Sequence, residues 1–152
     1  LWSCNNLYWY LTHACSPVTD GLMPYREADL LRNILDRADA ALKEGKNQAT
    51  LRFGHESCLL PLVALLELNH YGESYPDVEK LSEQWRAYDI FPMASNVQFV
   101  FFHKKGSNDV LVKVLLNEKE AKLPVKTDVA PYYHWKDVES YYREKLDKYQ
   151  HI

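Results

Sequence analysis

His55 and Glu56 are the residues whose types and spacing best support chemistry. They follow Leu51-Arg52-Phe53-Gly54, a β-prone run that ends at a glycine, and they precede a long apolar stretch from Cys58 to Leu68. This order predicts a strand, a tight turn and a buried helix that starts at the His-Glu pair. Unpaired backbone N–H groups and the positive end of the helix dipole favour anions at such a position. An imidazole and a carboxyl group placed there could bind a phosphate and supply a proton.

Other chemistry at this motif is less favoured. His-Glu begins the zinc-protease motif HExxH, but the fifth residue is Leu59, so the motif fails. Cys58 lies three residues after His55 and could form a nucleophilic pair with it, although a buried structural cysteine is the favoured interpretation. The three cysteines, Cys4, Cys15 and Cys58, match no metal-binding spacing, and we expect all three to be small buried residues. We expect neither a metal nor a cofactor. The simplest alternative is that His55 and Glu56 are ordinary turn residues.

The elements that must position this motif form an α/β pattern. Apolar periodicity predicts helices at 1–14, 25–44, 57–68, 77–85 and 135–148, and strands at 49–53, 97–103 and 110–116. Residues 16–24 are expected to form a loop, and Gly45 is well placed to end the second helix. The strand at 110–116 is almost continuously apolar, which is typical of strands covered on both faces. We therefore predict a layered sheet flanked by helices, and residues 1–152 show no internal repeat or domain boundary.

Composition excludes several classes of protein. The chain has 152 residues, of which 47% are hydrophobic and 26% are charged, and its net charge is −3. These values predict a globular domain with a core rather than a disordered chain, and they make nucleic acid an unlikely partner. No apolar run approaches the ~20 residues that span a bilayer.

The start at Leu1, within the predicted helix 1–14, predicts that the chain is an excised part of a longer protein. The remaining histidines, including His13, His134 and His151, are expected to be surface or structural residues.

Several segments together resemble one family, the multiple inositol polyphosphate phosphatases, in the histidine acid phosphatase (phytase-like) branch of the histidine phosphatases. The resemblance covers most of residues 25–118, in the family's order, and its motifs are more specific together than singly. The segments that carry it are Leu51–His55, Leu59–Leu66, Ala94–Val97 with Phe99-Val100, and Val114–Glu118.

The resemblance implies a phosphomonoesterase that acts on inositol polyphosphates through a phosphohistidine, as part of the histidine phosphatase α/β domain. In that family the nucleophilic histidine belongs to an N-terminal RHGxRxP motif, which is absent from this chain. The chain therefore resembles the C-terminal portion of the enzyme. Its partner would be the N-terminal part of the same enzyme, and the chain alone is expected to be inactive.

The resemblance also assigns site residues. His55 corresponds to the family's second histidine, which contacts the phosphate, and the family's acid protonates the leaving oxygen. The closest pattern is His-Ala-Glu, which would place the acid at position 57, but Ser57 stands there and a serine cannot act as the acid. Related phytases have His-Asp, so Glu56 is the predicted donor, in a position shifted by one residue. Arg52 and Asn96 are weaker candidates for substrate binding.

Two alternatives remain open. One is a general histidine acid phosphatase of other specificity, and the other is a non-catalytic phosphate-binding or structural module. By resemblance alone, we expect a secretory, periplasmic or extracellular location.

Overall fold

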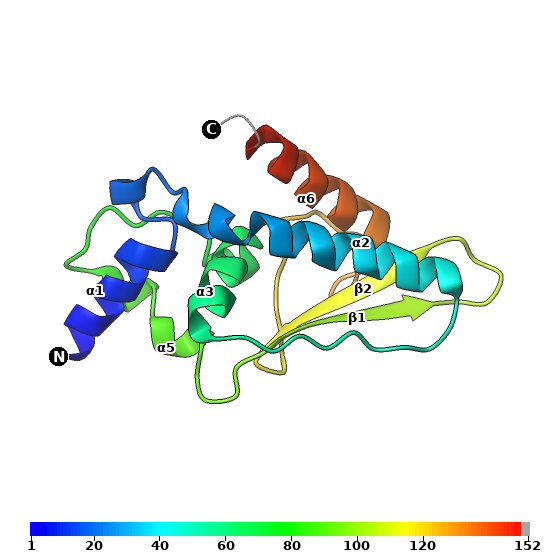
Figure 1. Cartoon of the computed structure of the whole chain (residues 1–152), viewed down its shortest axis with the longest axis horizontal. Coiled ribbons are helices and arrows are strands. Elements are labelled where there is room, and N and C mark those ends of the chain that lie inside the picture. Colours follow the sequence, from blue (N-terminus) through cyan, green and yellow to red (C-terminus); the bar gives the residue numbers. More distant parts are fainter. Residues whose placement is uncertain (150–152) are drawn as a thin grey trace.

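A computed structural model of the chain describes residues 1–149 (Figure 1). The elements in chain order are α1 (Trp2–His13), η1 (Pro17–Thr19), η2 (Met23–Glu27), α2 (Ala28–Glu44), α3 (Glu56–Leu65), η3 (Leu68–His70), α4 (Leu81–Gln84), α5 (Ala87–Ile90), β1 (Val97–His103), β2 (Val110–Leu116), β3 (Lys119–Glu120), β4 (Tyr133–His134) and α6 (Trp135–Tyr149). The predicted α/β class, with a sheet flanked by helices, is confirmed. His151 lies outside the described residues.

The sheet is an antiparallel hairpin with two short additions. β1 and β2 pair from Val97 opposite Leu116 to His103 opposite Val110, as their predicted bounds require. β3 and β4 both pair with β2, and neither was predicted, because two-residue strands carry no periodicity. The hairpin lies at the opposite end of the molecule from α1 and α5, with α2 and α6 along one side of it (Figure 1).

Burial along β2 alternates. Val112, Val114 and Leu116 are buried, whereas the residues between them are half-buried. The expectation that this strand is covered on both faces is therefore wrong for the described part of the chain. Helix α6 packs on β2, and this contact explains why one set of side chains is fully enclosed.

The predicted strand at 49–53 is also wrong. These residues are extended but belong to no sheet, and Leu51 and Phe53 are 75% and 94% exposed. A β-prone sequence becomes a strand only when a neighbour accepts and donates its ladder hydrogen bonds, and no such neighbour exists within residues 1–149.

The helices differ from prediction mainly at their ends. Helix 25–44 begins as the 3-10 turn η2, with Pro24 near its start, and continues as α2 to Gly45, which adopts the expected left-handed conformation with φ of 63°. The predicted helix 77–85 is reduced to α4, and α5 was not predicted because four residues are too few to show a helical period. The predicted loop 16–24 contains η1 and the start of η2.

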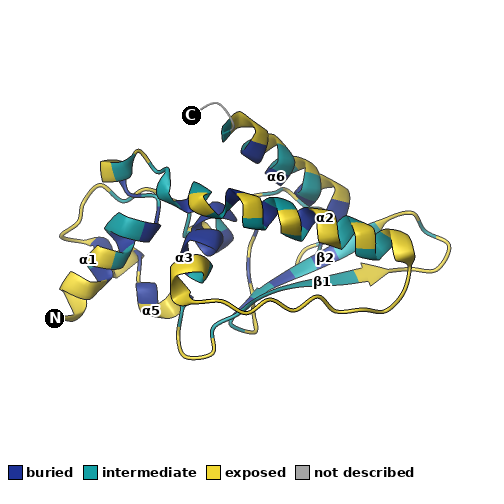
Figure 2. Ribbon diagram, in the orientation of Figure 1, coloured by how far each residue is buried: buried dark blue, intermediate teal, exposed yellow. Residues whose placement is uncertain are grey.

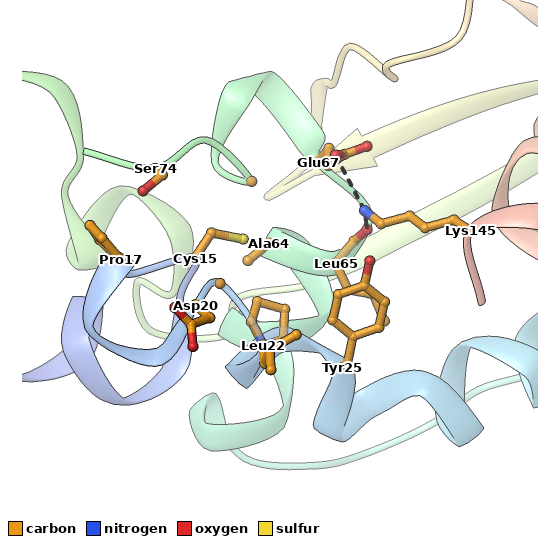
Figure 3. A pocket seen from close by; sticks show the side chains of 13 residues that line it. Cys15, Pro17, Asp20, Leu22, Tyr25, Ala64, Leu65, Glu67, Ser74 and Lys145 are labelled. Carbon is orange, nitrogen blue, oxygen red and sulfur yellow. Dashed lines mark hydrogen bonds and ion pairs between the residues drawn. The ribbon is translucent and has the colours of Figure 1, made fainter. Parts of the chain in front are cut away.

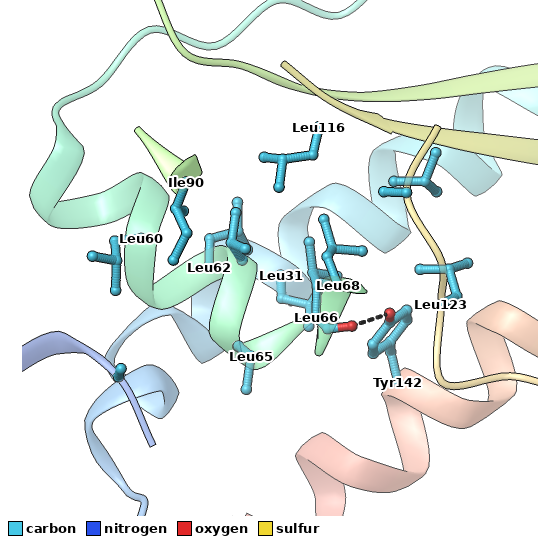
Figure 4. Close-up of a cluster of buried hydrophobic side chains, with 14 of the residues drawn as sticks. Leu31, Leu60, Leu62, Leu65, Leu66, Leu68, Ile90, Leu116, Leu123 and Tyr142 are labelled. Atoms are coloured by element: carbon cyan, nitrogen blue, oxygen red, sulfur yellow. Dashed lines mark hydrogen bonds between the residues drawn. The ribbon is translucent and has the colours of Figure 1, made fainter. Parts of the chain in front are cut away.

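Helix α3 lies at the centre of the core. Its residues from Leu60 to Leu65 are buried, whereas its first turn is exposed (Figure 2). Its apolar side chains pack against side chains from five other segments (Figure 4). These neighbours include Leu31 of α2, Ile90 of α5, Leu116 of β2, Leu123 of the segment between β3 and β4, and Tyr142 of α6. Each fully buried side chain of this size contributes roughly 1.5–3 kcal/mol, so the position of α3 is tightly fixed.

Candidate functional site

His55 and Glu56 occupy the predicted place at a helix start. His55 is the N-cap residue of α3, with an extended backbone, and Glu56 is the first helical residue. The carbonyl oxygen of His55 accepts hydrogen bonds from the N–H groups of Cys58 and Leu59 at 3.0 and 3.1 Å. Both side chains are exposed. The core anchors the rest of α3, so the helix presents an imidazole and a carboxyl group at a fixed, positively polarised helix end.

Arg52 contacts a different element. Its guanidinium group donates a hydrogen bond of 2.7 Å to Oδ1 of Asn33 on α2, and both side chains are exposed. This contact ties the extended segment before α3 to α2. It does not bring the guanidinium group into contact with His55 or Glu56 in the described structure.

Asn96 is engaged in the turn before β1. Its backbone N–H donates to Oδ1 of Asn117, and its side-chain oxygen accepts a hydrogen bond of 2.9 Å from Gln98. Asn117 also donates to the carbonyl oxygens of Asp89 and Ile90, so this cluster joins α5 to both hairpin strands. The contacts of Asn96 are those of a structural turn.

Two residues that no sequence pattern indicated, His13 and Arg26, lie in segments that pack against α3. His13 ends α1 and is 8% exposed, with its ring packed on Trp9 at 4.6 Å between centroids. Burial lowers the pKa of His13, the Arg26 guanidinium group lowers it further, and the Glu56 carboxylate opposes both. Both η2, which carries Arg26, and α1 pack against α3. These residues are far apart in the sequence, and their convergence depends on tertiary packing alone.

The cysteines differ from the favoured interpretation. Cys4 and Cys58 are exposed, so the prediction of buried structural cysteines is wrong at these two residues. Cys15 is half-buried. Cys58 is exposed because the first turn of α3 projects from the core. All three are free thiols. Within residues 1–149, no group of three or more His, Cys, Asp or Glu side chains is placed to hold a metal ion.

A pocket of about 470 Å³ lies near the other end of α3 (Figure 3). None of the four predicted site residues lines it. The ammonium group of Lys145 reaches into this pocket from α6. It donates a hydrogen bond of 2.7 Å to the carbonyl oxygen of Leu65 and forms an ion pair with the Glu67 carboxylate at 3.3 Å. Burial lowers the pKa of Lys145, and the Glu67 carboxylate opposes this. Burial raises the pKa of the Cys15 thiol to about 11, which makes it a poor nucleophile at neutral pH.

The backbone around Glu67 is tightly packed. Glu67 adopts a left-handed conformation with φ of 54°. A Cβ atom at Gly72 would lie 2.5 Å from Cγ of Glu67 and 2.7 Å from the carbonyl oxygen of Ala64, so only glycine fits there. The C-terminal end of α3 is thus held by specific polar and steric contacts, while its N-terminal end faces solvent.

No helix within residues 1–149 combines the length and the apolar character that crossing a bilayer requires.

The fold and the His-Glu helix start define a mixed α/β domain with a candidate anion site. The family model of the histidine phosphatase superfamily (branch 2) matches residues 25–117. The chain therefore belongs to this superfamily, and the resemblance seen in the sequence is confirmed.

Individual relatives are similar to the chain over a limited share of their length. Multiple inositol polyphosphate phosphatase 1 of Homo sapiens is 28% identical over 134 residues, which are 80% of this chain and 27% of the relative. The Gallus gallus protein of the same name is 27% identical over 135 residues, 77% of this chain and 28% of the relative. The chain thus spans little more than a quarter of these relatives.

Solved structures agree with this fold. The apo form of multiple inositol polyphosphate phosphatase from Bifidobacterium longum superposes with a TM-score of 0.77 at 24% identity, over 91% of this chain and 30% of that one. Its complex with inositol hexasulfate superposes with a TM-score of 0.68 at 26% identity, over 79% of this chain and 26% of the other.

Proposed function

We propose that this chain is part of an inositol polyphosphate phosphatase and that it supplies the proton donor and one phosphate-binding histidine. The observation that carries the proposal is the placement of His55 and Glu56. They form the exposed start of a helix whose remainder is anchored in the core, inside the part of the chain that matches the superfamily.

The proposed reaction divides the catalytic groups between two parts of the protein. A histidine outside this chain attacks phosphorus, and the bond between phosphorus and the inositol oxygen breaks. Glu56 gives its proton to the leaving oxygen, while His55 donates a hydrogen bond to a phosphate oxygen and stabilises its charge. Water then attacks the phosphohistidine and gives a proton to Glu56. The bond between phosphorus and the histidine nitrogen breaks, inorganic phosphate leaves, and Glu56 is again protonated.

Inositol polyphosphates are the proposed substrates because the similar proteins carry that activity in their names. The structure of one relative with inositol hexasulfate further supports a polyanionic ring as the ligand, because each sulfate stands in for a phosphate. Residues 1–152 contain no RHGxRxP motif, so the proposal assigns the nucleophile to the N-terminal part of the enzyme and predicts no turnover by the chain alone.

Trapping of the intermediate tests this proposal. The complete polypeptide that contains this chain is mixed with inositol hexakisphosphate that carries ³²P, quenched within milliseconds, and analysed for acid-labile, base-stable label. The proposal predicts phosphate release and a labelled phosphohistidine outside residues 1–152. Release of phosphate without a phosphohistidine would contradict the mechanism, and absence of release would contradict the function.

A further inference from the structure

The segment that leads into the candidate site is held to the rest of the fold by few contacts. It runs back from the end of α2 to the start of α3 (Figure 1). Every residue from 43 to 58 is exposed, and none packs against the hydrophobic core. Within residues 1–149, the stretch 47–54 makes two hydrogen bonds, both from side chains that reach α2. The first joins the amide group of Gln48 to the carbonyl oxygen of Ala41 at 3.2 Å.

The second hydrogen bond is made by Arg52 and joins the end of this segment to a rigid helix. The guanidinium group donates a hydrogen bond of 2.7 Å to Oδ1 of Asn33. Asn33 lies on α2 between Leu31 and Leu35, which are both fully buried, so the acceptor has a fixed position. Arg52 precedes His55 by three residues, at most about 10 Å along an extended chain. Arg52 thus fixes, from α2, the point at which the chain enters α3.

The path of the chain before α3 decides where the imidazole of His55 is directed. His55 is the N-cap residue and its backbone is extended, so its side-chain direction depends on the incoming chain as well as on the helix. The buried part of α3 begins only at Leu60. A group that contacts a reacting phosphate must be held within about 0.5 Å of its productive position. A contact that holds the incoming chain can therefore support catalysis without touching the substrate.

We propose that Arg52 is a positioning residue, whose hydrogen bond to Asn33 holds the chain so that His55 is directed toward the transferred phosphate. The inference rests on the proposed function and gives Arg52 a role other than substrate binding. The two roles differ in what they require of Asn33, which matters only if Arg52 acts through it. If a strand from the rest of the protein pairs with residues 49–53, it holds them within a sheet, and Arg52 holds that strand against α2.

A double-mutant cycle between the two residues tests the inference. In the complete polypeptide, Arg52→Met, Asn33→Ala and the double variant are assayed on inositol hexakisphosphate. Each single change is expected to lower kcat about fivefold with little change in KM, and the double variant to lose no more, because all three lack the same hydrogen bond. A raised KM in Arg52→Met with wild-type rates in Asn33→Ala would overturn the inference in favour of substrate binding. Losses that multiply in the double variant, or unchanged rates in both single variants, would overturn it too.

Two further variants serve as controls. Gln48→Ala removes the other hydrogen bond between the segment and α2, seven residues before His55, and is expected to keep wild-type rates. Asn33→Asp keeps an acceptor oxygen for Arg52 and is expected to keep wild-type kcat. A fall in Gln48→Ala equal to that in Arg52→Met would contradict a specific role of Arg52. A fall in Asn33→Asp equal to that in Asn33→Ala would show that the hydrogen bond is not what matters.

The NMR signals of the His55 ring separate this inference from the proposed function. They are measured in the complete polypeptide, assigned by their loss in His55→Gln, and need no turnover. Arg52→Met and Asn33→Ala are expected to shift the His55 signals alike, whereas Gln48→Ala leaves them in place. If the protein releases no phosphate from the hexakisphosphate, the proposed function fails, yet this pattern would still support the hydrogen bond as the contact that directs His55. Unmoved His55 signals in both variants would overturn the inference whatever the activity.

Discussion

The ammonium group of Lys145 in α6 donates a hydrogen bond of 2.7 Å to the carbonyl oxygen of Leu65, the last residue of α3. A cation at this end of a helix satisfies an unpaired carbonyl group and complements the negative end of the helix dipole. The neighbouring Tyr142 hydroxyl group donates a hydrogen bond of 2.7 Å to the carbonyl oxygen of Leu66. Helix α6 therefore fixes the end of the helix that carries His55 and Glu56 at its start.

Removal of this contact should destabilise the fold. Lys145→Met keeps the apolar stem but leaves the Leu65 carbonyl group and the Glu67 carboxylate without their cation. We expect a loss of about 1–3 kcal/mol in the free energy of unfolding, measured by urea titration. Lys148→Met is the control: its ion pair with Glu144 is exposed and should contribute less than about 1 kcal/mol. Equal effects of the two variants would contradict the role of Lys145.

His134 should make stability depend on pH. Its Nδ1 lies 3.0 Å from Asp109, at the entry to β2, and its Nε2 lies 2.9 Å from Asp128, so the protonated ring donates to both carboxylates. These hydrogen bonds raise the pKa of His134 above 6.5 and lower the pKa of Asp128 below 3.8. The raised pKa stabilises the fold below pH 6.5, and this contribution is lost as pH rises through the folded-state value. The lowered pKa stabilises the fold above pH 3.8, and this contribution is lost as pH falls through the folded-state value.

The difference in unfolding free energy between wild type and His134→Asn should therefore be largest near pH 5 and should decline above neutrality. An NMR titration of the His134 ring gives its pKa directly, and Asp109→Asn should lower that value. A pKa of His134 at or below 6.5 in the wild-type protein would contradict stabilising hydrogen bonds from this ring to Asp109 and Asp128. A stability difference that is the same at pH 5 and pH 9 would contradict them too.

Phe53 should matter only when the rest of the protein is present. Its side chain is 94% exposed here, so Phe53→Ser should change the stability of residues 1–152 by less than about 0.5 kcal/mol. If the N-terminal part pairs with this β-prone segment, as the proposed function requires of a complete catalytic domain, the same change should cost about 2–4 kcal/mol in the complete polypeptide. Thermal or urea unfolding of both forms measures the difference. Equal effects in the two forms would indicate that the segment stays uncovered.

The elements that could be predicted best from the sequence are those that depend on residues close together along the chain. The hairpin strands have their predicted bounds because each finds its partner a few residues away, and the burial of α3 follows from a run that is apolar nearly all round. The segment 49–53 failed because strand formation needs a partner that local residues do not reveal. The packing of α1 and η2 on α3 could not be predicted either, because these segments are far apart in the sequence. Arg52 and Asn96 were weaker candidates for substrate binding, and their observed contacts are with Asn33, Asn117 and Gln98.

The central claim is that Glu56 protonates the leaving oxygen. Glu56→Gln in the complete polypeptide keeps the size of the side chain and removes its proton. Glu44→Gln, at an exposed glutamate that ends α2, is the control and should retain wild-type rates.

The decisive measurement is kcat for this variant on two leaving groups. Inositol hexakisphosphate releases an alkoxide that needs a proton, whereas p-nitrophenyl phosphate releases a phenolate that departs without one. The account predicts that Glu56→Gln lowers kcat on the hexakisphosphate by about 10²–10⁴-fold and lowers it far less on the phenyl ester. Wild-type kcat on the hexakisphosphate, or equal losses on both substrates, would contradict the assignment of Glu56 as the proton donor.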